Sequence, residues 1–490
     1  MFNDFKGFVL LSISFFIALI SNAQGLGNSP YSRVGLGDMM GYRGNIRNMG
    51  MGYAGSSLTS KDYMNVLNPA GLANFKNQNQ DSLVKFDVGF TIQYKSFKAG
   101  ETQATSSGAN INNIAFTFPV SKVYTSGFML SPLTIVQNKY SFTDTVPNDP
   151  NNYSALYKYL GSGGVYQLQW MNGIGITKNL ALGVTLGYNF GTITQEATSQ
   201  LIIDPNYPDA ENEVGSQAKT NYSGVSFKPG FIYKKQLYQR KKYFYYTVDS
   251  TKKIMEDGTV YYVADTIRRD SVSRKVGPVN FKFGASAELF PGVKATETQS
   301  LFVRNPRNLI TSDSTVSKKT SSANFPATYR MGASLEKPGY WLVAADFVYT
   351  DWSNYDKNKG KNSELNSSSY TFALGGEIMP RNFVKNSSKI YRGHRVKTYR
   401  AGFSYTATPV NVAGRILYDY AFSVGASIPV GVRSKGSVNT AYVPILPKLN
   451  VAFVVGQRST FTTTELSETY FRLQLSMTLY DKWFHKRRIQ

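Results

Sequence analysis

The sequence predicts an all-β transmembrane protein, an antiparallel β-barrel of about fourteen strands with an N-terminal plug, or hatch, in its lumen. Three observations predict this fold: an export signal, long segments in which apolar and polar residues alternate, and short links that alternate with long ones. The 490 residues include 34 Tyr, 31 Phe and 42 Gly, two His and no Cys. This composition favours strands and turns, and it excludes disulfides and thiolate chemistry.

The first 23 residues are typical of a secretory signal peptide. Lys6 precedes an apolar run over residues 8–20, and Ser21-Asn22-Ala23 supplies a small-residue cleavage site. The run is shorter than the roughly 20 residues that a membrane-spanning helix needs. We therefore expect an exported chain whose mature part begins at Gln24.

The clearest strand is expected over residues 468–480, where Phe471, Leu473 and Leu475 alternate with polar residues. A soluble β-sandwich would show the same period, but links such as 178–180 are short and stretches such as 194–220 are long, which favours an outer-membrane barrel over residues 86–480. The expected strands lie near residues 86–97, 111–120, 123–136, 164–177, 181–192, 221–234, 279–290, 325–337, 340–351, 369–379, 398–408, 418–430, 447–458 and 468–480.

Several short motifs resemble the FadL-type outer-membrane transport family, and residues 29–38 resemble its version in Bacteroidetes-like bacteria. They are the Gly-rich residues 48–55, Asn68-Pro69-Ala70-Gly71, Phe325-Pro326-Ala327, Asp351-Trp352-Ser353 and the last strand with Trp483-Phe484. The resemblance implies a hatch over residues 24–85 inside a fourteen-stranded barrel. It also implies uptake of hydrophobic small molecules of the long-chain fatty acid or hydrocarbon type.

The physical need for a plug can be argued from the barrel alone. A barrel of fourteen strands is too wide to be filled by its own side chains, and glycine permits the irregular backbone of a plug. The pattern Gly50-x-Gly52-x-x-Gly55 also matches a dinucleotide-binding turn, but no strand–helix–strand unit surrounds it. Asn68-Pro69 could be an ordinary turn. The residues expected to form or gate the hatch are Gly50, Gly52, Gly55, Asn68, Pro69 and Ala70.

The sequence offers no catalytic or metal site, so we expect neither an enzyme nor a cofactor. His394 lies among cations, and no Gly-x-Ser-x-Gly elbow accompanies it. Acidic residues in one long loop could hold Ca²⁺, but their spacing matches no defined metal loop and a solvated outer loop is favoured. Those residues are Asp204, Asp209, Glu211 and Glu213.

Residues 236–278 are unusual, because strand counting places them in the periplasm, where turns should be short. Two β-rich runs around Glu256-Asp257-Gly258 predict a projecting hairpin. The formal net charge is +23, and the hairpin, the turn over residues 381–397 and the C-terminal tail 481–490 carry much of it. The residues expected to dock a partner are Lys241, Lys242, Tyr243, Tyr245, Tyr261, Arg268 and Arg269.

Two functions of different classes remain open at this point. The first is an outer-membrane channel that admits hydrophobic small molecules. The second is a non-transporting barrel subunit of a larger outer-membrane complex for protein secretion or insertion, which the basic hairpin favours. The hairpin could dock an acidic protein or anionic lipid headgroups, or it could serve only solubility and attraction to the inner leaflet. Nucleic acid is not an expected partner in the periplasm.

Overall fold

The computed structural model describes residues 25–40, 44–60, 62–75, 83–203, 211–355, 364–379, 397–430, 447–462 and 466–481. The predicted signal peptide, the basic turn over residues 381–396 with His394, Asp204, Asp209 and the tail beyond residue 481, with Trp483 and Phe484, lie outside these ranges. Within the described ranges, no helix has the length and apolar character needed to cross a bilayer, which says nothing about a β-barrel.

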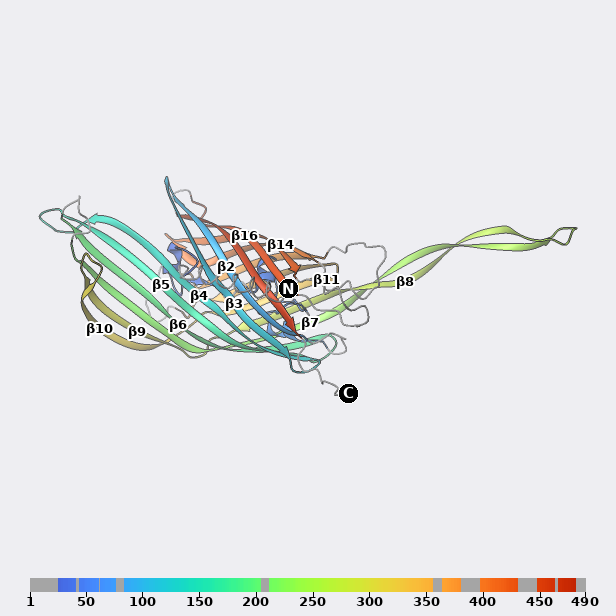
Figure 1. Cartoon of the computed structure of the whole chain (residues 1–490), viewed down its shortest axis with the longest axis horizontal. Helices are drawn as coiled ribbons and strands as arrows, with labels where there is room; N and C mark the ends of the chain where they lie inside the picture. The colour runs from blue at the N-terminus through green and yellow to red at the C-terminus, as the bar shows by residue number, and fades with distance from the viewer. Residues whose placement is uncertain are drawn as a thin grey trace, which may run out of the picture.

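Fourteen strands form a closed antiparallel barrel, because the last strand pairs back onto the first strand of the ring (Figure 1). The ring consists of β2 (Val84–Ala99), β3 (Thr102–Pro119), β4 (Tyr124–Thr145), β5 (Ser154–Gly175), β6 (Leu180–Ile202), β7 (Glu213–Ile254), β8 (Val260–Glu288), β11 (Ala327–Lys337), β12 (Trp341–Asp351), β13 (Ser368–Ile378), β14 (Thr398–Val412), β15 (Arg415–Pro429), β16 (Lys448–Ser459) and β17 (Ser467–Asp481). Each corresponds to one of the expected strands, so the predicted fold class is confirmed.

The wall turns its apolar side chains outward and its polar side chains inward. On β17, Phe471 and Leu473 are about two-fifths exposed, whereas Arg472 and Gln474 between them are buried. A soluble protein buries its apolar side chains and exposes its polar ones. In a bilayer the arrangement is reversed, because apolar side chains contact lipid while the polar ones face the interior. The chain is therefore an outer-membrane β-barrel.

A hairpin of two strands outside the ring was not predicted from the sequence. The region 291–324 was expected to be a link, but it forms the hairpin of β9 (Val293–Arg304) and β10 (Ile310–Ala323). β9 extends the sheet beside the outer part of β7, and β10 pairs with β9. β10 is polar and almost fully exposed on both faces, so it lacks the two-residue hydrophobic period that marks the other strands.

On the opposite side of the barrel, β7 and β8 continue as a two-stranded ribbon that projects far beyond the wall (Figure 1). Short turns such as residues 338–340 lie on the same side, which makes it the periplasmic side. From Leu237 to Ile254 the ribbon has roughly 17 residues per strand, which at about 3.4 Å per residue gives about 60 Å. The tip is a defined turn in which Gly258 has φ +84° and the Met255 amide donates to the Thr259 carbonyl at 2.9 Å.

The wall is split between β3 and β4 in its outer half. These strands pair only from Pro119 to Ile114, and in Figure 1 the outer parts of β2 and β3 diverge from β4. Pro132 lies two residues beyond Leu130, the last position of β4 that pairs with β3, and it has no amide hydrogen to continue the ladder. Gly163 of β5, which pairs with Val136 further along β4, adopts φ +101°, a conformation that lets β5 bend together with β4 away from β3.

Candidate functional site

Residues 25–75, called the N-terminal segment below, lie inside the ring of strands. The segment contains η1 (Pro30–Arg33), β1 (Asp38–Met39), α2 (Ile46–Met49) and η2 (Pro69–Leu72). α2 contacts β15, β16 and β17, whereas η2 contacts β5, β6 and β7. Because these strands belong to different sides of the barrel, the segment crosses the lumen.

The Gly-rich motif lies where the segment approaches the backbone of β14 and β15. A Cβ atom added to Gly52, which has φ +62°, would lie 2.5 Å from the backbone of Phe403. Likewise, a Cβ at Gly50 would lie 3.3 Å from the Cα of Gly425. A Cβ at Gly55 would clash instead with Asn48 of the segment itself. These three glycines therefore permit close packing, inside the segment and against the wall.

The Asn68-Pro69-Ala70 motif lies elsewhere, against β5 to β8. The Asn68 side chain caps η2 by accepting from the Ala70 amide at 3.1 Å, and it donates to the Phe231 carbonyl of β7 at 3.0 Å. A Cβ at Gly183 of β6 would lie 2.2 Å from the Ala70 nitrogen. The two predicted motifs thus pack against different strands of the wall, and the Asn68 side chain also donates to the Ser56 carbonyl, next to Gly55, at 2.8 Å.

A buried ion-pair cluster, which was not predicted from the sequence, fixes α2 to the wall. Glu377 of β13 accepts from Arg47 Nε at 2.9 Å and from Arg400 Nε of β14 at 2.7 Å. All three side chains are buried. The Tyr63 ring lies 4.8 Å from the Arg47 guanidinium and 4.9 Å from that of Arg400. The one indication of this cluster in the sequence is that Glu377 and Arg400 are charged residues at inward-facing positions of strands.

A second buried cluster ties the segment to β15, β16 and β17. Arg458 donates to Asp419 at 3.0 Å and to Asp38 of β1 at 2.9 Å. Arg472 donates to the Tyr53 hydroxyl at 3.2 Å and lies 3.8 Å from the Tyr470 ring. Buried charges are retained only when they are paired, so each contact holds the segment in one position.

Asp346 of β12 binds the turn after the Gly-rich motif. Its Oδ2 accepts from the Gly55 amide at 2.8 Å and from the Ser56 amide and hydroxyl at 2.7 Å. We expect Asp346→Ala to lower the free energy of unfolding by about 1–3 kcal/mol for each donor left without a partner. Asp346→Asn keeps an acceptor oxygen and should cost less than half as much. Urea unfolding followed by tryptophan fluorescence checks both, and equal losses in the two variants would contradict this role.

The segment also fills the split between β3 and β4. β1 pairs with β4 at Thr134 and Ile135, and Gly25 forms a bridge with Ala109 of β3. Between them, the Ser29 amide donates to the Gln137 carbonyl at 2.7 Å. Backbone polar groups at the split are thus paired by the chain's own N-terminal residues, as lipid surroundings require.

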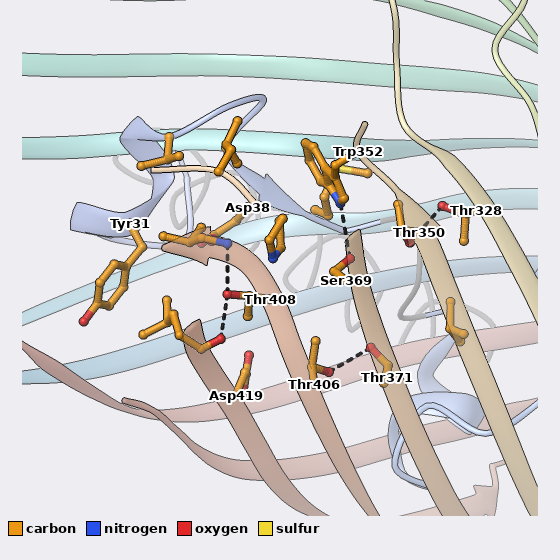
Figure 2. Close-up of a pocket in the computed structure, with 18 of the residues that line it drawn as sticks. Tyr31, Asp38, Thr328, Thr350, Trp352, Ser369, Thr371, Thr406, Thr408 and Asp419 are labelled. Carbon is orange, nitrogen blue, oxygen red and sulfur yellow. Dashed lines mark hydrogen bonds between the residues drawn. The ribbon is translucent and has the colours of Figure 1, made fainter. Parts of the chain in front are cut away.

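A cavity of about 90 Å³ lies between the outer side of the segment and β11 to β15 (Figure 2). Its wall includes hydroxyl pairs that bond to each other, Thr328 with Thr350 at 3.2 Å and Thr371 with Thr406 at 2.9 Å. Trp352 lies above them and donates to Ser369 at 3.2 Å. Two deeper cavities among the described residues measure only about 10 and 20 Å³. These three cavities between the segment and the wall are therefore small.

The residues predicted for partner docking lie along the ribbon. Lys241, Lys242, Tyr243 and Tyr245 belong to β7, and Arg268 and Arg269 belong to β8. Tyr261 lies near the tip, where its side chain is exposed.

One acidic residue of the expected outer loop is placed differently. Glu213 begins β7, is buried, and pairs with Arg304 at 2.5 Å. The expectation that it lies in a solvated loop is therefore wrong.

The closed ring with an apolar exterior and an internal N-terminal segment defines an outer-membrane β-barrel, and its fold is similar to that of FadL-type channels. The CymD monoaromatic hydrocarbon channel has a TM-score of 0.50 and 12% identity, covering 91% of this chain and 99% of that chain. A Pseudomonas aeruginosa FadL homologue has a TM-score of 0.50 and 12% identity, covering 91% and 100%. The P. putida toluene transporter TodX has a TM-score of 0.48 and 12% identity, covering 91% and 100%.

The sequence itself identifies a different family. The BamG family model matches residues 5–490, so the chain belongs to the BamG family. No curated protein matches the sequence. The FadL resemblance is thus confirmed at the level of the fold, and its Bacteroidetes-like version stays a prediction.

Proposed function

We propose that this chain is a sealed, non-transporting barrel that serves as a subunit of a larger outer-membrane complex for protein insertion or secretion. The observation that carries the proposal is the β7–β8 ribbon, which extends about 60 Å from the wall. A two-stranded hairpin is marginally stable alone in water. A ribbon of this length is therefore best explained as one half of a contact with another protein.

The small size of these cavities supports the non-transporting part of the proposal. Sites for small molecules usually measure about 300–1,000 Å³, whereas the cavity between the outer side of the segment and the wall is about 90 Å³. The buried ion pairs of Arg47 and Arg458 would have to break for the segment to move, and separating a buried pair costs about 3–5 kcal/mol. Passage of a long-chain fatty acid would require both enlargement and displacement.

Purification from outer membranes in a mild detergent tests the proposal. We expect the chain to migrate on size-exclusion chromatography with other proteins in fixed ratio. The protein should be expressed at its native level and purified without crosslinking. Elution as a monomer without other proteins would then contradict the subunit role.

A second candidate is an uptake channel for small hydrophobic molecules. The CymD channel is similar in fold, and the split between β3 and β4 would offer a lateral exit if residues 25–40 left it. The cavity has room for a ligand of about one ring at most, far less than a fatty acid. Mass spectrometry of extracts from the purified protein tests this candidate. A stoichiometric apolar ligand would favour it, and extracts free of such a ligand would count against it.

A further inference from the structure

We propose that one face at the tip of the β7–β8 ribbon, formed by Lys252, Ile254, Val260 and Tyr262, docks a periplasmic protein through an acidic surface with an apolar centre. This inference rests on the proposed function and names the contact through which the chain would join its complex.

The four side chains share a face of the ribbon. Lys252 pairs directly with Tyr262, and Ile254 pairs with Val260, so all four point to the same side. Tyr262 is 68% exposed and Ile254 is 65% exposed. The turn beyond them is fixed by its own hydrogen bonds, so the apolar side chains are held in water by an ordered backbone. A cluster of exposed apolar side chains on an ordered element marks an interaction site.

The positive charge of the ribbon favours a partner with an acidic surface. Lys252 belongs to this face, and Lys253 lies beside it on the opposite face. Residues 234–275 contain eleven Lys and Arg against five Asp and Glu. Two positive ribbons repel each other, which disfavours a second copy of this chain, and an acidic surface is complementary.

The length of the ribbon favours a protein, and not the membrane surface, as the partner of the tip. Basic residues attract anionic headgroups only within about a Debye length of the surface, roughly 8–10 Å. The ribbon carries its tip about 60 Å from the wall, and Figure 1 shows it continuing outward from the barrel end. The tip is therefore placed to meet a soluble domain in the periplasm.

Photocrosslinking in intact cells tests the tip. Tyr262 is replaced by p-benzoylphenylalanine in the full-length chain, and a matched variant carries the same amino acid at Tyr261, which pairs with Lys253 on the opposite face. We expect a discrete adduct from position 262, at least fivefold stronger than from position 261. Its tryptic peptides should come from a periplasmic protein with an acidic surface. Lys252→Glu should reduce the adduct at least fivefold, and Lys252→Arg should preserve it.

Each alternative result overturns the inference. The inference is wrong if position 262 forms adducts with lipid or with a second copy of the chain. It is also wrong if both positions give equal adducts or if no adduct forms. Size-exclusion chromatography of the same preparations separates the two proposals: an intact complex without a tip adduct refutes this contact alone, whereas a lone monomer refutes the subunit role.

Discussion

Glu377→Ala is expected to destabilise strongly the packing of the N-terminal segment in the lumen. The change leaves both Arg47 and Arg400 buried without their carboxylate partner. Removing one partner of a buried ion pair costs about 3–5 kcal/mol, and here two cations lose theirs. We expect a lower midpoint of urea unfolding, and proteolysis of the N-terminal segment at protease concentrations that leave the wild type intact.

An exposed ion pair of the same segment provides the control. Arg33 donates to Glu364 at 2.6 Å, but both side chains are more than a third exposed. Exposed pairs contribute about 0–1 kcal/mol, so Arg33→Ala should leave the midpoint nearly unchanged. Equal effects of the two substitutions would show that the buried cluster does not hold the segment.

Removal of the ribbon is expected to abolish association while leaving the barrel folded. Arg240 pairs with Lys275, so an Asn-Gly turn can join these residues in place of 241–274. The deleted residues contribute nothing to closure of the ring, which β8 and β11 complete at Asn280 and beyond. We expect co-purifying proteins to fall at least tenfold, while the heat-dependent shift in gel mobility typical of folded barrels is kept.

A deletion on the outer side is the matched control for the ribbon. Residues 147–151 form the turn between β4 and β5, at the end of the wall away from the ribbon. Their removal should preserve association. Partners retained after loss of the ribbon would place the contact elsewhere on the barrel.

The strands of the wall could be predicted because the bilayer imposes a local pattern. Lipid contact demands an apolar residue at every second position, as in β17, and this signal needs no knowledge of distant residues. It fades where strands leave the bilayer. β4 was therefore expected to end at residue 136 but continues to Thr145, and the polar β10 was missed.

The interior could not be predicted in the same way, because its contacts join residues that are far apart in the chain. Arg47 and Glu377 are 330 positions apart, and no motif beside either residue indicates that the two form an ion pair. The split in the wall is also a long-range feature. Pro132 on β4 and Gly163 on β5 each permit a bend, but Pro132 pairs with Tyr166 and Gly163 pairs with Val136, and neither local sequence shows that both residues lie beside the split.

Ion conductance across a planar lipid bilayer measures most directly whether the chain's own N-terminal segment seals the barrel. The full-length mature protein should add no steady conductance to the bare bilayer, and a variant lacking residues 26–75 should open a persistent pore. Steady conductance of equal size from both proteins would show that the segment does not close the lumen. A folded barrel that stays closed without the segment would contradict the account equally.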